Sequence, residues 1–181
     1  MNNYSTDFKE SFKYIKQTKA LAMAGMLIAL SIVLSFFDIY ITQEIRISIR
    51  FIAYGLIAML YGAPMATLCG GISDILCHII KPAGAFHIGF TISAMLTGLI
   101  LGLILYKKKP SLVRISIACL LVSVFINIFL TTYWLYLYYG KAMEILLPAR
   151  AVKNLIALPI EIIIMYVSAK VVERITKKKN S

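Results

Sequence analysis

Charged residues are scarce in this chain: they make up 15% of its 181 residues, whereas 60% of the residues are apolar. A soluble domain carries about 25% charged residues, so this composition excludes an ordinary soluble fold and indicates a single membrane domain. Cysteine is sparse as well. Cys69, Cys77 and Cys119 all lie inside apolar segments and lack the spacing of a disulfide framework or a metal site, so we expect them to be packing residues.

Motifs for catalysis and nucleotide binding are missing too. The chain has only two histidines, and it contains no Gly-x-Ser-x-Gly, no His-Glu-x-x-His and no Gly-x-x-x-x-Gly-Lys-Ser/Thr. We therefore expect no enzyme activity, no metal site and no cofactor. Glu161, two residues after Pro159 in an apolar run, has two interpretations: a proton or ion relay, or a structural carboxylate in a helix loosened by proline.

The charge balance is strongly basic, with 19 Lys and Arg residues against 8 Asp and Glu residues. The basic residues gather between and beyond the apolar runs, where lipid head groups and membrane topology account for them, so we do not expect nucleic-acid binding. No cleavable signal peptide is expected, because the first apolar run follows a polar start of about 19 residues and is long enough to cross a membrane.

The long apolar runs predict an all-α membrane protein with six transmembrane helices. A cytoplasmic N-terminal segment, 1–19, precedes this membrane domain, 20–172, and a basic cytoplasmic tail, 173–181, follows it. Residues 38–49 alternate too irregularly for a span and predict an ordered loop on the outer face. The six predicted spans cover about residues 20–37, 50–61, 65–80, 87–106, 115–138 and 148–172.

The distribution of Lys and Arg predicts the orientation of these spans. In the six-span scheme, 13 of the 19 basic residues lie on the inner side or at inner helix ends. By the positive-inside rule, both termini are therefore expected in the cytoplasm.

Small residues at intervals of four predict close helix packing in two spans. Ala94, Gly98 and Gly102 form one smooth face along the fourth span. Ala20 and Ala24 have the same spacing at the start of the first span, where they allow either packing inside the chain or contact with another protein.

Polar residues inside the apolar segments are the main functional signal, because an ionisable group at membrane depth costs about 2.5–3.5 kcal/mol on insertion scales. Helical spacing groups them on three faces, each in a different span. These faces have to converge away from lipid, and we predict that they enclose a polar pocket open to the outer face. The faces consist of Asp74 and His78, of Asn127, Thr131 and Trp134, and of Arg150 and Asn154.

Hydrogen bonds between helices are the alternative explanation of these faces. For Thr131 and Asn154 taken alone, that explanation is the one we prefer. For Asp74, a pair with His78 that holds the helices together is the alternative to contact with a ligand.

The expected chemistry of the pocket defines a class of ligand. Fixed positive charge near the mouth suits carboxylates, and aromatic side chains together with amide and carboxylate groups suit a flat heteroaromatic ring. For Tyr138 and Tyr139, an aromatic belt at the membrane interface is the alternative explanation that we prefer. The basic residues expected at the mouth are Arg46, Arg50, Lys81, Arg150 and Lys153, and the aromatic surfaces expected are Phe86, Tyr133, Trp134 and Tyr138.

Several ordered runs resemble a known family. With Ala20-x-x-x-Ala24 they are Arg46-Ile-Ser-Ile-Arg-Phe51, Gly70-Gly-Ile-Ser-Asp74, Pro82-Ala-Gly-Ala-Phe-His-Ile-Gly-Phe-Thr91 and Leu147-Pro-Ala-Arg150-x-x-x-Asn154. Together they resemble the substrate-binding S components of energy-coupling-factor (ECF) vitamin transporters, and among these the folate family. The resemblance covers roughly residues 20–172 and depends on the combination of runs rather than on any one of them.

The resemblance implies a high-affinity binding subunit of an ECF-type importer in a bacterial cell membrane. Such a subunit captures folate at the outer face and has no ATPase of its own. It would dock through Ala20 and Ala24 of the first helix onto a transmembrane T component, which carries two cytoplasmic ATPase subunits. The substrate-binding residues expected from the pocket and the resemblance are Arg46, Arg50, Asp74, His78, Phe86, His87, Asn127, Thr131, Trp134, Arg150 and Asn154.

Other functions remain open at this point. Sister S components bind thiamine, riboflavin or pantothenate with the same fold. A stand-alone secondary transporter is a second class, although no repeat relates residues 20–106 to 112–172, and the helix break suggested by Pro159 has no counterpart in the first half. A membrane enzyme is a third class, and it lacks clustered acids or metal ligands.

Overall fold

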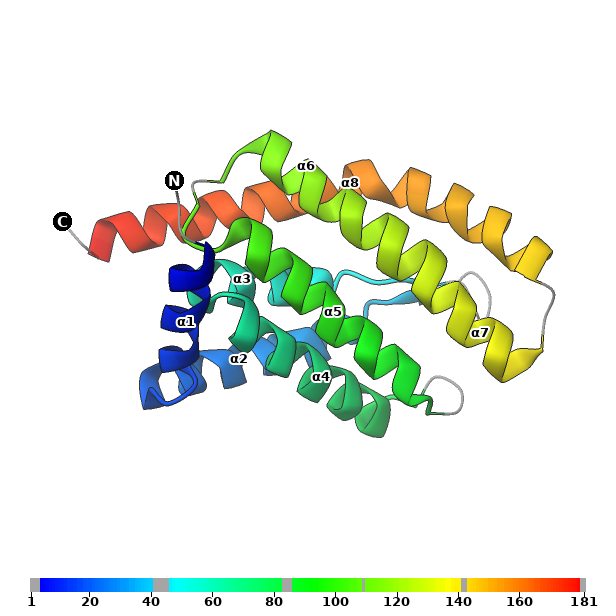
Figure 1. The fold of residues 1–181 in the computed structure, drawn as a ribbon, viewed down its shortest axis with the longest axis horizontal. Coiled ribbons are helices and arrows are strands. Elements are labelled where there is room, and N and C mark those ends of the chain that lie inside the picture. Colours follow the sequence, from blue (N-terminus) through cyan, green and yellow to red (C-terminus); the bar gives the residue numbers. More distant parts are fainter. Residues whose placement is uncertain (1–3, 41–45, 83–85, 109, 141–142, 180–181) are drawn as a thin grey trace.

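The computed structural model describes residues 4–40, 46–82, 86–108, 110–140 and 143–179 (Figure 1). Within these residues the regular secondary structure is helical apart from two strands of two residues each, which confirms the predicted all-α class. In chain order the elements are α1 (Tyr4–Tyr14), α2 (Thr18–Ser35), β1 (Ile39–Tyr40), β2 (Arg46–Ile47), α3 (Phe51–Tyr61), α4 (Ala63–Ile80), α5 (Ile88–Leu105), α6 (Leu112–Leu121), the π-helix η1 (Val122–Leu130), α7 (Thr131–Tyr139) and α8 (Met143–Lys179).

Five helical stretches among the described residues are long and apolar enough to cross a membrane, and they correspond to five of the six predicted spans. The counterpart of the remaining span is α3, which is apolar but has 11 residues, fewer than the ~20 that a straight crossing needs. The chain is therefore a multi-pass membrane protein. The five stretches are Thr18–Ser35, Ala63–Ile80, Ile88–Leu105, Leu112–Leu137 and Arg150–Arg174.

The tightest helix pair is α4 with α5. A Cβ at Gly98 would collide with the backbone carbonyl of Ala66, and one at Gly102 would collide with the backbone of Ala63. The two backbones touch because neither position has a side chain, which is how small residues stabilise helix pairs where the hydrophobic effect is weak. The close packing predicted from the small residues of the fourth span is confirmed.

Helix α8 is longer than the predicted span 148–172 at both ends. It begins at Met143, includes Pro148 and Pro159, and ends at Lys179. The predicted span began at Pro148, a residue that lacks a backbone donor and disfavours helix before it. Within a membrane, an unpaired backbone group costs more free energy than a local distortion of the helix does. The helix therefore continues through Pro148.

The polar segment 1–19 contains helix α1, which lies against the end of the bundle that also holds the C-terminus (Figure 1). Ser11 is 1% exposed and occupies the space where a side chain at Gly62 would lie. Gly62 has a φ of +83°, so glycine suits this turn between α3 and α4 for two reasons. The Lys107 ammonium pairs with Glu10 and lowers the pKa of that carboxyl group.

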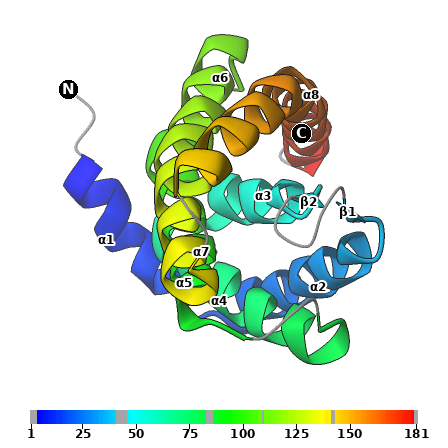
Figure 2. The same cartoon turned by 90° about the vertical axis from the view of Figure 1, so that its right-hand side faces the viewer.

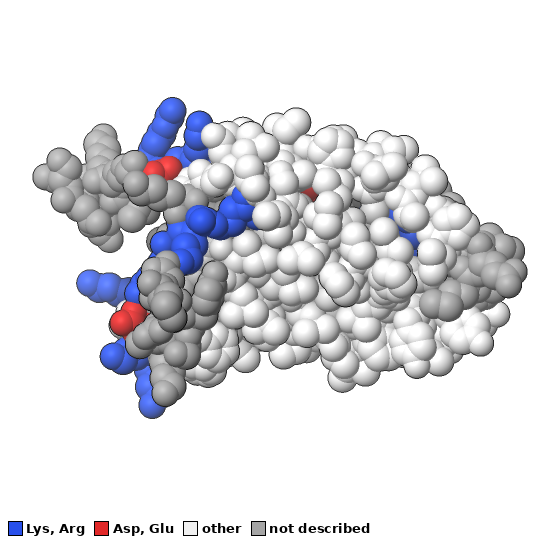
Figure 3. Space-filling view, turned by 45° about the horizontal axis from the view of Figure 1, so that its top comes forward, with Lys and Arg blue, Asp and Glu red and all other residues white. Residues whose placement is uncertain are grey.

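Lys and Arg side chains gather at the end of the molecule where both termini lie (Figures 1 and 3). At the opposite end, strands β1 and β2 pair antiparallel beside α2 and α3 (Figure 2), so the ordered loop predicted at 38–49 is seen in its described part. Residues 41–45 lie outside the described residues. The exposed basic residues include Lys13, Lys16, Lys19, Lys107, Lys170 and Arg174.

Candidate substrate-binding cavity

A cavity of about 170 Å³ lies inside the bundle, lined by residues of α3, α4, α5, the continuous α6–η1–α7 segment and α8. The three polar faces identified in the sequence each contribute to its wall, apart from His78 and Trp134. Among the described residues, no three His, Cys, Asp or Glu side chains lie close enough together to hold a metal ion. The predicted binding residues that line the cavity are Arg50, Asp74, Asn127, Thr131, Arg150 and Asn154.

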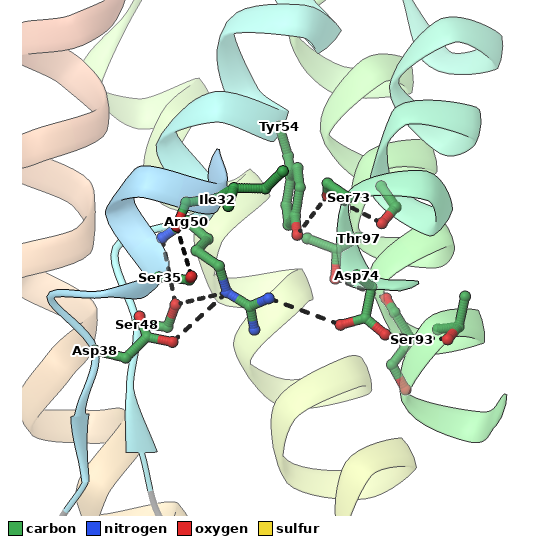
Figure 4. A network of polar contacts seen from close by, with 12 residues as sticks. Ile32, Ser35, Asp38, Ser48, Arg50, Tyr54, Ser73, Asp74, Ser93 and Thr97 are labelled. Atoms are coloured by element: carbon green, nitrogen blue, oxygen red, sulfur yellow. Dashed lines mark hydrogen bonds and ion pairs between the residues drawn. The ribbon is translucent and has the colours of Figure 1, made fainter. Parts of the chain in front are cut away.

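Arg50, at the start of α3, is the centre of a buried polar network (Figure 4). Its Nε lies 3.1 Å from Ser48 Oγ and 3.7 Å from Asp38 Oδ2, and its Nη1 lies 3.8 Å from Asp74 Oδ1. Asp74 Oδ2 in turn accepts a hydrogen bond of 3.0 Å from Thr91 Oγ1. Because two carboxylates compensate the buried guanidinium, its charge is held in the cavity wall without a ligand.

The alternative pair between Asp74 and His78 is wrong. Asp74 bonds to Arg50 and Thr91, whereas the His78 ring lies 5.2 Å from the Phe86 ring. The two residues share a helix face, as their spacing predicts, but partners on α3 and α5 are better placed for the carboxylate than a side chain on its own helix.

The π-helix η1 shapes the wall opposite α3. The Thr131 N–H donates to Ile126 O, five residues earlier, so the backbone bonding pattern shifts by one residue where η1 returns to α-helix. The next carbonyl along the chain, that of Asn127, accepts a hydrogen bond of 3.1 Å from Arg150 Nη1. This hydrogen bond connects the irregular backbone at the end of η1 to α8. Irregular backbone is tolerated in membrane proteins where it lines a cavity, as it does here.

Helix α8 presents basic and amide groups to the same cavity. Asn154 is 3% exposed, and its Oδ1 accepts a hydrogen bond of 3.3 Å from Lys153 Nζ. Arg150, Lys153 and Asn154 lie within little more than one helical turn and all line the cavity. Further along α8, Glu161 and Met165 line it as well.

Four predicted binding residues lie outside this wall, in aromatic contacts near the ends of α4, α5 and α7. His87 caps α5, its Nδ1 accepting a hydrogen bond of 3.0 Å from the Gly89 N–H. The His87 ring lies 5.6 Å from that of Trp134, which packs directly on Gly89. His78 and Phe86 form the other contact. The side chain of Arg46, the remaining candidate, lies outside the described residues.

The two alanines expected to dock a partner are buried in this chain's own core. Ala20 is 2% exposed and Ala24 is 3% exposed. The exposed small residues of α2 are instead Ala22, Gly25 and Ala29, which lie on the other side of the helix. The structure therefore supports the packing interpretation of Ala20 and Ala24, and their docking role stays a prediction.

Sequence reasoning missed one whole wall of the cavity, which α5 provides. Phe90, Ser93, Thr97 and Leu101 line it at spacings that place them on one face of the helix. Ser93 Oγ donates to Gly89 O at 3.0 Å, and Thr97 Oγ1 donates to Ser93 O at 2.8 Å. Both hydroxyl groups donate hydrogen bonds to carbonyls of their own helix, as serine and threonine commonly do in membrane helices. Their helical spacing was the signal that could have found them.

Comparison with known proteins identifies the family. A sequence model described as "ECF transporter, substrate-specific component" matches residues 19–169. The chain belongs to this family. It is a family of transporter subunits rather than of catalysts, in keeping with the missing catalytic motifs. The resemblance to folate-family S components noted from the sequence is confirmed by the relatives and the solved structure that follow.

Two relatives and one solved structure show how far the likeness to other ECF substrate-specific components extends. The folate transporter FolT of Clostridium novyi (strain NT) is 35% identical over 161 residues, which cover 89% of this chain and 94% of that protein. The folate transporter FolT of Leuconostoc mesenteroides is 35% identical over 169 residues, 89% of this chain and 91% of that protein. A crystal structure of FolT bound with folic acid has a TM-score of 0.80 and 37% identity, covering 85% of this chain and 94% of that one.

Proposed function

We propose that this S component binds folate in the cavity between α3, α5, η1 and α8. The observation that carries the proposal is the likeness to folic acid-bound FolT over nearly the whole length of both chains. The cavity has the chemistry such a ligand needs, since basic groups lie at one end and planar side chains line the wall beside them.

The wall residues have distinct proposed roles. Arg50 and Arg150, with Lys153, bind the glutamate carboxylates of folate, because charge-assisted hydrogen bonds to carboxylates are strong. Asn127 and Asn154 supply amide hydrogen bonds, and Phe90 offers an apolar ring surface. Asp74 and Thr131 complete the polar wall, with Asp74 also fixing Arg50. For His78, Phe86, His87 and Trp134, which lie outside the wall, and for Arg46, we propose contact with the ligand as it enters.

The proposed topology has six crossings with both termini in the cytoplasm. The gathering of Lys and Arg at the end that holds both termini supports this orientation under the positive-inside rule. α3 makes the short second crossing, and the cavity with Arg50 and Arg150 then opens toward the outer face. The protein would lie in a bacterial cell membrane, as expected from the bacterial relatives.

Transport requires partners in this proposal: a T component and two ATPase subunits that drive uptake with ATP. Helix α2 supplies the docking face, because its span is buried over only 22% of its length. Gly25 on this face has nothing within 4 Å of where a Cβ would lie, which leaves room for a partner helix to approach closely.

Uptake of radiolabelled folate by proteoliposomes tests this division of labour. The protein alone should bind folate without accumulating it, and accumulation should require the T component, both ATPases and ATP. Accumulation by this chain alone, driven by an ion gradient, would instead establish a secondary transporter. Thiamine, riboflavin and pantothenate serve as comparison substrates, and uptake of one of them in place of folate would reassign the ligand.

A further inference from the structure

The residues that line the cavity extend over several turns of α8, and their charge differs between the two ends of this stretch. Arg50 lies where α3 begins, just after the β1–β2 hairpin, and Arg150 lies about two turns after the start of α8. Glu161 and Met165 lie further along α8, and Glu161 is about 16 Å from Arg150 at 1.5 Å per residue. Leu101 of α5 lines the same deep part of the wall. The cavity therefore has a basic entrance and one acidic group at its apolar inner end.

Glu161 lines the wall, but its carboxylate holds none of the other described residues in place. Among the described residues, no hydrogen bond or ion pair reaches its carboxylate, and the cation that acts on it electrostatically is Lys153, two helical turns away. Asp74, the other acid of the cavity, is fully engaged by Arg50 and Thr91. A carboxylate in an apolar wall at membrane depth is costly to keep and calls for a donor that the protein does not supply.

We propose that Glu161 binds the N–H edge of the ring system of folate. This inference rests on the proposed function. The ring carries an amide N–H and an amino group side by side, and a carboxylate accepts two such parallel bonds with its two oxygens. The ligand enters ring first, and its own carboxylates stay at Arg50 and Arg150. The ligand carboxylates then meet basic side chains at one end and the ring N–H donors meet a carboxylate at the other, which fixes the orientation of the ligand.

A role in binding the ring can be distinguished by experiment from the two interpretations of Glu161 given by the sequence, a structural carboxylate and a proton or ion relay. A structural carboxylate would affect every ligand equally when neutralised. A proton or ion relay would affect transport and leave equilibrium binding unchanged. A ring-binding carboxylate affects equilibrium binding, and only of ligands that carry the two donors.

Calorimetric titration of the full-length protein in detergent tests the proposal, with folic acid and a folic acid analogue that lacks the ring amino group. The Glu161→Gln variant should bind folic acid at least tenfold more weakly than the unmodified protein does. It should bind the analogue with the same affinity as the unmodified protein does. The matched control is Glu173→Gln, a change in the same helix outside the cavity, and it should leave both affinities unchanged. Equal weakening of both ligands by Glu161→Gln, or no weakening, would overturn the proposal.

The unmodified protein provides a second measurement that does not depend on a variant folding. It should bind folic acid at least tenfold more tightly than the analogue, and equal affinities would overturn the role of Glu161. Failure of the unmodified protein to bind folic acid at all is a separate result, because it removes the proposed function and this inference with it.

Discussion

At the scale of single residues, charges inside apolar segments were the most informative feature of the sequence. Asp74 and Arg150 were selected because a charge in lipid is costly, and Arg50 because a basic residue was expected at the pocket mouth. All three line the cavity. Trp134 and His87 were selected by spacing and by the resemblance, and they lie just beyond the wall. The spacing of residues shows which of them share a helix face. It does not show where along that face a cavity ends, because the packing between helices determines that.

The first prediction concerns Arg150, which reaches Asn127 O across the cavity. Arg150→Ala should weaken folate binding about 10- to 100-fold, because a hydrogen bond to a charged group contributes about 1.5–3 kcal/mol. Arg150→Lys should lose less, since the charge remains but the fork geometry does not. Equilibrium binding measured by calorimetry checks both variants.

Arg174→Ala is the control for Arg150, because Arg174 is an exposed arginine of the same helix at the end where the termini lie. It should bind folate as the unmodified protein does. Unchanged affinity in Arg150→Ala would remove this residue from the proposed site.

At the scale of elements, hydropathy predicted the five long spans because lipid demands length and apolarity of any single crossing. It could not predict η1, since Val122–Leu130 has the composition of any apolar helix. The hydrogen bond from Arg150 to the Asn127 carbonyl likewise becomes visible only in the fold. Helix α1 was missed for the opposite reason. Its residues are polar, and burial of Ser11 against the α3–α4 turn becomes visible only in the fold.

The second prediction concerns the contact between α4 and α5. Gly98→Ala should lower the stability by about 1–3 kcal/mol, because the added methyl group meets the Ala66 carbonyl and the two backbones have to separate. The thermal unfolding midpoint in detergent is the measurement. Gly25→Ala is the matched control, because it adds the same group where nothing lies within 4 Å, and equal midpoints for the two variants would contradict the packing account.

At the scale of the whole molecule, the fold separates the cavity from the exposed surface of α2, where we propose that a partner docks. The resemblance drew attention to Ala20 and Ala24, but one chain's sequence cannot say which side of a helix faces its own core. The structure assigns these two alanines to the core and leaves Gly25 on the outside. Docking and binding should therefore be separable by mutation.

The third prediction uses that separation. Gly25→Phe should leave folate affinity unchanged and abolish uptake in proteoliposomes that contain the partner subunits, because the large ring keeps the partner helix at a distance. Ala24→Phe should instead lower both stability and binding, because the added ring has to enter the core. Normal uptake by Gly25→Phe would contradict docking through this face of α2.

The central claim is that the cavity binds folate, and calorimetric titration of the purified protein tests it most directly. The account predicts one saturable site for folic acid at submicromolar concentration, with no heat of binding from thiamine, riboflavin or pantothenate under the same conditions. Saturable binding of one of those vitamins and none of folic acid would contradict the account.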